Sequence, residues 1–234
     1  MPDTLSGREI ILAGGSGGLG SETARLLAAE GARVIVSYKS DAVRAAALSD
    51  VATLVQADIT VAADRARLFA AAPSLYALVV FSGRPARDES QLEESLAVNF
   101  AAPIRLAREA AAQMKASGTH GAVVLVSTMQ TSAVFTNSTT YAAPKAALVH
   151  AARILAKECR GPADIRVNVV SPGVNDAGMA RASIASGKYA PYLDGGAIPR
   201  YGRALDVARA VRFFLEPDNY VTGQILTIDG GLTL

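Results

Sequence analysis

Seven short apolar runs, separated by stretches long enough for a helix, constrain the fold of this chain more than any other feature. Most are apolar throughout, which is typical of parallel strands buried on both faces. The amphipathic stretches between them include 21–31, 92–116 and 205–216. This alternation predicts βαβ units and therefore an α/β fold, a doubly wound seven-stranded parallel sheet with helices on both faces. The apolar runs span residues 9–13, 33–37, 52–57, 76–81, 122–127, 166–171 and 224–229.

Composition predicts one intracellular domain. The 234 residues suffice for one large core, half of them are hydrophobic, and no linker or repeat divides them. The net charge of +2 comes from scattered residues, which argues against nucleic-acid or membrane-surface binding. The single cysteine, Cys159, fits a reducing compartment. The sequence has no secretory signal pattern and no apolar run of the ~18 residues that a membrane span needs, so we expect a cytoplasmic protein.

The segment AGGSGGLG, residues 13–20, follows the first apolar run and precedes the first amphipathic stretch. Gly14, Gly18 and Gly20 have the spacing GxxxGxG. Glycine permits a tight turn, close approach of a ligand to the backbone, and packing of helix on strand. The following helix directs its N-terminal N–H groups and the positive end of its dipole to the same place. In this context the segment predicts a pyrophosphate site rather than an incidental glycine-rich turn.

The end of the second apolar run bears on which dinucleotide is bound. An acidic residue there, ~20 residues beyond the glycines, would bond the ribose hydroxyls of NAD. The chain has SYKSD instead, with Tyr38 and Lys39 near that position. We therefore favour NADP(H) over NAD(H), although Lys39 could be an ordinary exposed lysine and Asp41 could turn toward the ribose. Asp58 could accept from the adenine amino group or simply stand at a helix N-terminus.

Tyr141 and Lys145 stand four residues apart in TTYAAPKAALVHAARILAKE, so a helix would place them on one face. A free tyrosine, with a pKa of ~10, is a poor base near neutral pH. A nearby ammonium would lower that pKa, and the pair could then exchange a proton with a carbonyl oxygen or an alcohol. Pro144 fits the helix only in its first turn, where its missing N–H has no partner to lose. This predicts Tyr141 at the helix start.

Together these motifs resemble the short-chain dehydrogenase/reductase family over nearly the whole chain, from about Ser6 to Gly231. The resemblance implies a single NAD(P)-binding Rossmann domain over residues 1–234. The closing pattern and the run IPRYGRALDVARAVRFFL are most similar to the 3-oxoacyl-carrier-protein reductase branch. The motifs that carry the resemblance are AGGSGGLG, VNF around Asn99, VVLVST, YAAPK, RVNVVSPG and YVTGQILTIDGG.

The family implies a catalytic tetrad of Asn, Ser, Tyr and Lys. Asn99 matches the asparagine that would hold a water in a proton relay to Lys145, unless it is a buried or capping polar residue. Tyr141 matches the acid/base, and Lys145 the lysine that also bonds the nicotinamide ribose. The family spacing, 13 residues before Tyr141, falls on Thr128. The residue type that the family uses there, serine, favours the neighbouring Ser127 instead. Adjacent strand-end residues point to opposite sides, and spacing leads us to prefer Thr128.

The predicted cofactor site contains no metal and draws on several segments. Three departures from the family pattern mark a somewhat divergent member: Val80-Phe81-Ser82-Gly83 replaces Asn-Asn-Ala-Gly, Ala177 replaces a threonine that contacts the carboxamide, and Ala13 replaces the leading threonine of the glycine motif. The residues predicted to bind the cofactor are Gly14, Ser16, Gly17, Gly18, Leu19, Gly20, Tyr38, Lys39, Ser40, Asp58, Ile59, Ser82, Gly83, Tyr141, Lys145, Pro172, Gly173 and Val174.

The resulting prediction is an NADP(H)-dependent reductase that converts a carbonyl, such as a ketone or a 3-oxoacyl thioester, to a secondary alcohol. The alternatives are an alcohol dehydrogenase acting on a sterol, sugar or aromatic diol, and a non-catalytic NADP-binding regulator. The weakly periodic segment 174–203 predicts a lid over a small-molecule substrate. The family implies a homotetramer, with a dimer as second choice, paired through 92–116, 141–159 and the last strand. The lid's apolar wall would be Met179, Ile184, Tyr189, Tyr192 and Leu193.

Overall fold

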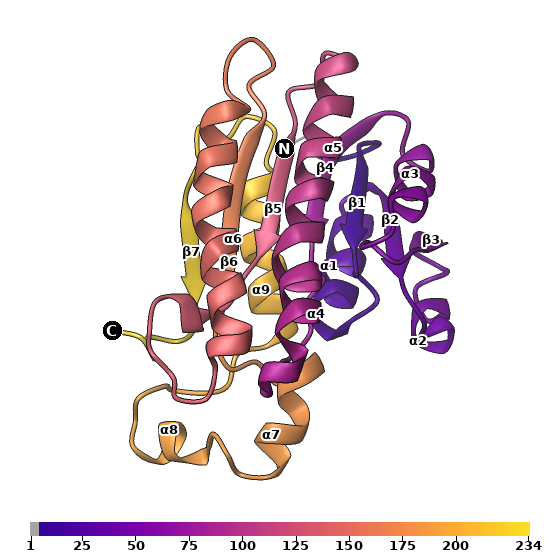
Figure 1. Cartoon of the computed structure of the whole chain (residues 1–234). Helices are drawn as coiled ribbons and strands as arrows, with labels where there is room; N and C mark the ends of the chain where they lie inside the picture. Colours follow the sequence, from indigo (N-terminus) through magenta and orange to yellow (C-terminus); the bar gives the residue numbers. More distant parts are fainter. Residues whose placement is uncertain (1–4) are drawn as a thin grey trace.

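Seven parallel strands form a single sheet in the computed structural model, which describes residues 5–234 (Figure 1). The strand order is β3-β2-β1-β4-β5-β6-β7. Each strand begins and ends within one residue of its predicted bounds, which confirms the predicted α/β fold with a seven-stranded parallel sheet. The strands are β1 (Glu9–Ala13), β2 (Arg33–Tyr38), β3 (Ala52–Gln56), β4 (Leu75–Val80), β5 (Ala122–Val126), β6 (Arg166–Pro172) and β7 (Ile225–Ile228).

Helices cover both faces of the sheet. The long helices α1 and α9 pack on one face, and α3, α5 and α6 pack on the other (Figure 1). The helices are α1 (Gly18–Ala29), α2 (Ala42–Ala46), α3 (Ala62–Ala70), α4 (Leu92–Leu96), α5 (Ala102–Ala116), α6 (Thr139–Glu158), α7 (Arg181–Ala185), α8 (Ala190–Asp194) and α9 (Ala204–Leu215). Shorter turns are η1 (Glu89–Gln91), η2 (Ala97–Ala101), η3 (Met129–Thr131) and η4 (Gly178–Ala180).

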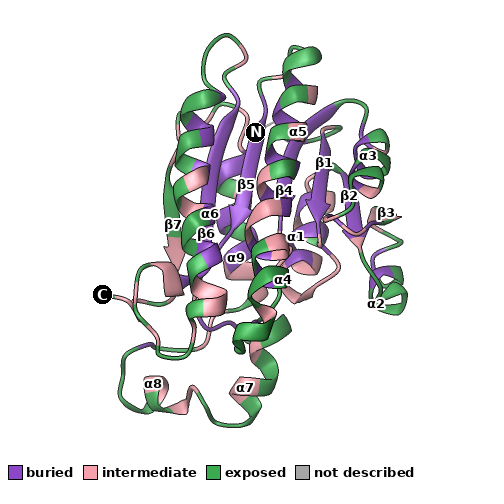
Figure 2. Ribbon diagram, in the orientation of Figure 1, coloured by how far each residue is buried: buried purple, intermediate pink, exposed green. Residues whose placement is uncertain are grey.

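The central strands are buried on both sides (Figure 2). Ile11 of β1 joins the core cluster that contains Leu106 of α5. Its neighbour Leu12 joins the cluster on the other face, with Leu27 of α1 and Phe214 of α9. Successive side chains of a strand point to opposite faces, so a strand between two helical layers must be apolar at every position. This explains the unbroken apolar runs of the sequence.

One helical prediction was confirmed and one was wrong in detail. The chain is helical over 92–116 as expected, and this stretch contains the π-helical turn η2 between α4 and α5, which includes Asn99. Pro144 was expected in the first turn of its helix, but α6 begins at Thr139 and Pro144 lies in the second turn. There its missing N–H leaves a carbonyl of the preceding turn without a helical partner. Tyr141 is nevertheless near the helix start, as predicted.

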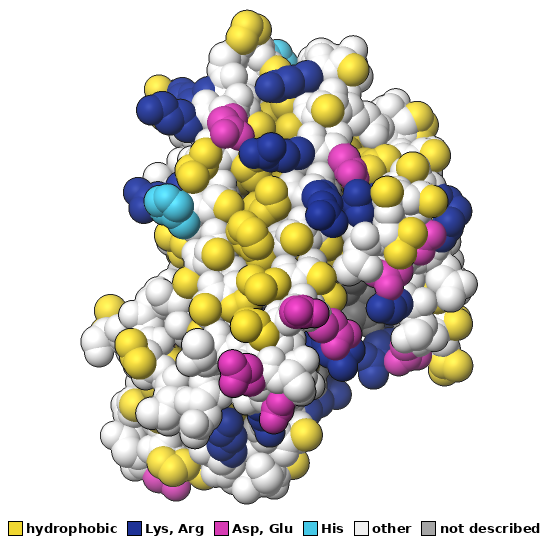
Figure 3. Space-filling view, in the orientation of Figure 1, with side chains coloured by type: hydrophobic (Ala, Val, Ile, Leu, Met, Phe, Trp, Pro, Cys, Tyr) yellow, Lys and Arg dark blue, Asp and Glu magenta, His cyan; other side chains and the backbone are white. Residues whose placement is uncertain are grey.

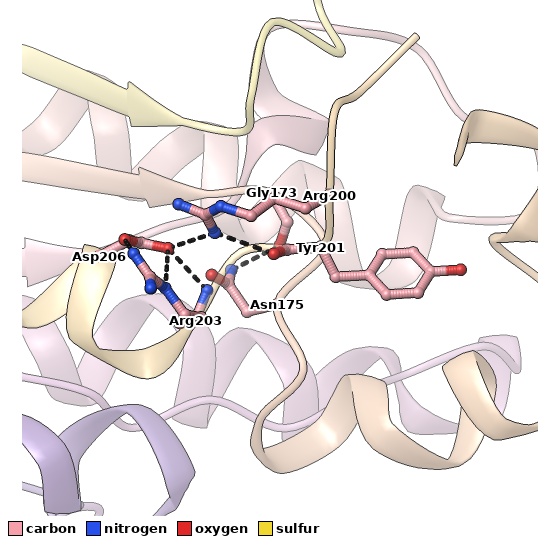
Figure 4. A network of polar contacts seen from close by, with 6 residues as sticks. All are labelled: Gly173, Asn175, Arg200, Tyr201, Arg203 and Asp206. Atoms are coloured by element: carbon pink, nitrogen blue, oxygen red, sulfur yellow. Dashed lines mark hydrogen bonds and ion pairs between the residues drawn. The ribbon is translucent and has the colours of Figure 1, made fainter. Parts of the chain in front are cut away.

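Residues 174–203 form a loop that leaves the sheet after β6 and returns to α9, with its two ends bonded to each other. The backbone N–H of Gly202 donates to the carbonyl of Val174 at 2.9 Å, and the backbone N–H of Asp176 donates to the carbonyl of Gly202 at 2.8 Å. At the start of α9, Asp206 accepts from Arg200 Nη1 at 2.6 Å and from the backbone N–H of Arg203 at 2.8 Å (Figure 4). Hydrogen bonds from the two arginines hold the pKa of Asp206 well below its usual range. We call this hydrogen-bonded base of the loop the lid neck; it consists of Val174, Asp176, Arg200, Gly202, Arg203 and Asp206.

The face formed by α4, α5 and α6 carries a stripe of apolar side chains (Figure 3). Leu92, Leu96 and Ile154 are exposed there, and Ile225 and Leu226 are exposed on the edge strand β7. These are the elements through which a homotetramer was expected to form. The tetramer stays a prediction, which sedimentation at micromolar concentration tests.

None of the helices within residues 5–234 is both long and apolar enough to cross a membrane.

Candidate active site

The candidate site lies where the strand order reverses, between β1 and β4. The loops that leave the carboxyl ends of these two strands run to opposite sides, which opens a crevice in doubly wound sheets. A cavity of about 930 Å³ occupies this place. The lid helices α7 and α8 lie beyond the same ends of the strands (Figure 1). The cavity is therefore bounded by the glycine loop, the strand ends, the start of α6 and the lid.

Most of the residues predicted for the site line this one cavity. Two do not. Tyr38, the last residue of β2, is not among the lining residues, whereas its neighbours Ser37 and Lys39 are, so its place in the cofactor site stays a prediction. Asn99 is fully buried behind the cavity wall. The predicted residues that line the cavity are Gly14, Ser16, Gly17, Gly18, Leu19, Gly20, Lys39, Ser40, Asp58, Ile59, Ser82, Gly83, Ser127, Thr128, Tyr141, Lys145, Pro172, Gly173 and Val174.

The glycine loop is packed too tightly for a side chain at several of its positions. Gly14 has φ +70°, and a Cβ on it would lie 2.7 Å from Ser82 Oγ. A Cβ on Gly18 would lie 2.5 Å from the backbone N of Gly178 at the base of the lid. The helix α1 begins at Gly18 with no side-chain cap, so its first N–H groups are free to bind an anion. The loop therefore fits the pyrophosphate of a dinucleotide.

At the far end of the cavity, Lys39 is paired with a carboxylate. Its Nζ lies 2.7 Å from Asp58 Oδ2. Although partial burial raises the pKa of Asp58, hydrogen bonds from Lys39 and Thr60 outweigh this and hold it at about 2. Asp41 also lines the cavity, but its carboxylate is engaged within α2: Oδ1 accepts from the backbone N–H of Arg44 at 2.9 Å, and Oδ2 lies 3.2 Å from Arg44 Nε. Arg44, which sequence reasoning missed, lines the cavity beside Lys39.

The structure distinguishes the two candidate hydroxyls at the end of β5. The Thr128 side chain is hydrogen-bonded to Tyr141. The Ser127 hydroxyl instead donates to the backbone carbonyl of Lys145 at 3.2 Å. The two adjacent side chains therefore point to different places, and only Thr128 reaches the phenol.

The Tyr141 phenol is held in its protonated form. Burial raises its pKa to about 12, against a smaller lowering by the hydrogen bond with Thr128. The expectation that Lys145 lowers this pKa is wrong for the structure described. Its ammonium donates instead to the carbonyls of Val126 at 2.9 Å and Ser82 at 3.4 Å. Burial also lowers the pKa of Lys145 to about 8, because the charged form loses its hydration.

Asn99 lies behind Gly83, next to Lys145. A Cβ on Gly83 would be 3.5 Å from both Asn99 Oδ1 and Lys145 Nζ. The Asn99 amide is used in full by the protein: Oδ1 accepts from Arg84 N at 3.0 Å, and Nδ2 donates to Arg84 O and to Ser95 Oγ, each at 2.9 Å. A water-holding role for Asn99 stays a prediction. The π-helical turn around it is a feature that is frequent at functional sites.

The lid supplies part of the predicted apolar wall. Met179, Tyr189 and Tyr192 line the cavity, and the two tyrosine rings stack with centroids 6.2 Å apart. Ile184 and Leu193 do not line it, because short helices leave one side of each turn facing away. Sequence reasoning also missed several lining residues. Ser37 and Phe81 lie next to predicted site residues, whereas Arg84, Arg87 and Lys188 belong to no motif. Among residues 5–234, no three His, Cys, Asp or Glu side chains are grouped to hold a metal ion.

The fold and this cavity define a dinucleotide-binding α/β protein. A family model described as enoyl-(acyl carrier protein) reductase matches residues 13–233. The chain is 29% identical over 264 residues to NADPH-dependent aldehyde reductase 2, chloroplastic, of Arabidopsis thaliana, covering 100% of this chain and 96% of that protein. It is 27% identical over 241 residues to the 3-oxoacyl-[acyl-carrier-protein] reductase MabA of Mycobacterium tuberculosis, covering 96% and 92%.

A solved structure of a short chain dehydrogenase/reductase family protein matches with a TM-score of 0.86 and 31% identity, covering 99% of this chain and 100% of that one. The chain belongs to the short-chain dehydrogenase/reductase family. It is an oxidoreductase that acts between CH–OH and C=O groups, and its fold is an NAD(P)-binding Rossmann domain. The similar proteins named above are enzymes, which counts against the alternative of a non-catalytic regulator.

Proposed function

We propose that this enzyme uses NADPH to reduce the carbonyl group of a small molecule to a secondary alcohol. One observation carries the proposal. The cavity that contains the glycine loop also contains a half-buried phenol, Tyr141, which is hydrogen-bonded to Thr128 and has a pKa raised to about 12. A phenol held in its protonated form is suited to give a proton to a developing alkoxide.

The protein's own groups have distinct tasks in this proposal. NADPH, when bound, supplies the hydride that the carbonyl carbon accepts. Tyr141 donates a proton to the carbonyl oxygen, and the Thr128 hydroxyl donates a second hydrogen bond to the same oxygen. Lys145, held by the carbonyls of Val126 and Ser82, is a buried cation one helical turn from Tyr141, and it returns a proton to the Tyr141 phenolate. Asn99 fixes the Gly83–Arg84 backbone against which Lys145 packs.

Lys39 and Arg44 support the preference for NADPH. Both line the end of the cavity that lies beyond the glycine loop, where an adenosine 2′-phosphate would be placed. The Lys39–Asp58 ion pair is largely exposed on the lysine side, so Lys39 can exchange its partner for a phosphate at little cost. The similar Arabidopsis protein is named as NADPH-dependent.

The test measures NADPH and NADH oxidation side by side on a carbonyl panel that includes an acetoacetyl thioester. We expect kcat/KM to favour NADPH by at least ~10-fold, and Lys39→Ala to lower kcat/KM for NADPH ~10-fold while leaving NADH unchanged. Lys115→Ala, at an exposed site on α5, is the matched control. Equal use of both cofactors by the wild type, or an equal fall for both in Lys39→Ala, would contradict the assigned preference.

The same panel examines the substrate. The wall formed by Met179, Tyr189 and Tyr192 favours a carbonyl with apolar substituents. The named 3-oxoacyl and aldehyde reductases among similar proteins support a 3-oxoacyl thioester or an aldehyde as the first compounds to try.

The two directions of the reaction should differ in their pH dependence. Because the pKa of Tyr141 is raised, the phenol is protonated throughout the neutral range, so carbonyl reduction should be level from pH 6 to 7. It should fall above pH 8, where Lys145, whose pKa is lowered to about 8, loses the proton that it returns. Alcohol oxidation needs the phenolate, whose fraction grows about tenfold per pH unit below the pKa. We therefore expect oxidation to rise from pH 7 to 9 without a plateau. A level oxidation rate over that range would show that the acid/base titrates far below about 12.

A further inference from the structure

Ser95, at the end of α4, connects three parts of the active site that are far apart in sequence. It is buried, with 1% of its surface exposed. Its hydroxyl donates to the backbone carbonyl of Thr140 in α6 at 2.6 Å. The same oxygen accepts a hydrogen bond from Asn99 Nδ2 at 2.9 Å. A hydroxyl has one proton to donate, so the bond to Thr140 fixes Ser95 as the acceptor for Asn99.

The need for this bond arises from Pro144. In an α-helix the carbonyl of Thr140 would accept from the backbone N–H four residues later, at position 144. Proline has no N–H, so that carbonyl would be left unbonded inside the protein. Ser95 supplies the missing donor from a neighbouring helix. A serine and a proline 49 positions apart thus act together at the helix turn that carries Tyr141.

The second bond of Ser95 continues toward Lys145. Ser95 fixes which way the Asn99 amide faces, and that amide bonds both the N–H and the carbonyl of Arg84. The Arg84 segment follows directly on Ser82 and Gly83, and the Ser82 carbonyl accepts from Lys145 Nζ at 3.4 Å. The chain of bonds therefore runs from the Tyr141 turn, through Ser95 and Asn99, to the backbone that holds Lys145.

We propose that Ser95 is a positioning residue of the active site, required because Pro144 frees the Thr140 carbonyl, and that it sets the placement of Tyr141 relative to Asn99 and Lys145. The proposal rests on the proposed carbonyl reduction for its kinetic effect. Ser95 acts through the residues that it bonds, since neither Ser95 nor Pro144 lines the cavity.

The test is a double-mutant cycle on Ser95 and Pro144. Ser95→Ala leaves the half-buried Thr140 carbonyl and the buried Asn99 amide each without this partner, and we expect kcat to fall ~10-fold with the KM for NADPH within about twofold of the wild type. Pro144→Ala alone restores an N–H while Ser95 remains, so its kcat should stay within about twofold. In the double variant the Thr140 carbonyl regains a helical donor, and kcat should recover to ~3-fold below the wild type.

Ser117→Ala is the control for the chemical change, because Ser117 also donates its hydroxyl to a backbone carbonyl but is exposed at the end of α5. An unchanged kcat in Ser95→Ala would overturn the proposal, as would an equal fall with and without Pro144. If the wild type reduces no carbonyl, the proposed function fails, and the cycle is read from the unfolding temperature instead. Ser95→Ala must then lower Tm more in the presence of Pro144 than in the Pro144→Ala background, or the proposal fails too.

Discussion

Tyr141→Phe is expected to lower kcat for carbonyl reduction by about a thousandfold while the Kd for NADPH stays within about threefold of the wild type. The substitution removes one oxygen from a ring at the start of α6 and leaves the backbone, the glycine loop and Lys145 in place. The lost oxygen is the one that is hydrogen-bonded to Thr128. Single-turnover kinetics with NADPH fluorescence separate binding from chemistry.

The matched control is Tyr220→Phe, at a tyrosine that is 95% exposed and does not line the cavity. It should retain wild-type kcat. If Tyr141→Phe kept a tenth or more of the activity, the proton would have to come from another group, and Thr128 is the hydroxyl next to it. If it lost NADPH binding instead, the phenol would be part of the cofactor site rather than the acid/base.

Gly20→Ala is expected to raise the Kd for NADPH ~100-fold and to lower stability by about 3 kcal/mol, which corresponds to ~6–12 °C in Tm. A Cβ on Gly20 would lie 2.6 Å from both Cα and O of Gly15, and these backbone atoms cannot rotate away as a flexible side chain would. The first turn of α1 would have to separate from the glycine loop. Both the packing of the helix and the alignment of its N–H groups would suffer.

Gly17→Ala is the control within the same loop. Its Cβ would meet only Gly14 O, at 3.7 Å, and its φ of −72° is one that alanine adopts readily. This variant should keep Tm within about 2 °C of the wild type. Thermal unfolding and NADPH titration of the two variants therefore separate a steric effect of the added methyl group from a general effect of losing a glycine. Equal Tm values for both would contradict the close packing at Gly20.

The fold could be predicted closely because its signal is local. Burial on both faces makes each strand a continuous apolar run, and each run ends where a glycine, proline or polar cluster begins. The site could be predicted as a set of positions because the glycine loop, Tyr141 and Lys145 belong to short motifs with fixed spacing. Their placement around one cavity follows from the strand order.

What the sequence could not supply were effects that depend on contacts between distant segments. The pKa of Tyr141 is set by burial, which no spacing rule reports, so its direction was predicted wrongly. Lys145 was expected to act on Tyr141, but its ammonium is bonded by carbonyls from two strand ends. Pro144 was placed in the first turn because the sequence does not show that Ser95 replaces the missing donor.

The lid neck has a consequence for how this fold can change its substrate. The two ends of the lid are bonded to each other and to the start of α9, so the strands do not depend on what lies between them. Loop-closure entropy rises only slowly with length, by about 0.6 kcal/mol for each doubling. The residues between Gly178, which packs against Gly18 of the glycine loop, and the buried Ile198 can therefore be replaced as one unit. A lid of different length and composition, grafted between these two residues, would bring a new substrate preference to an unaltered chemical site.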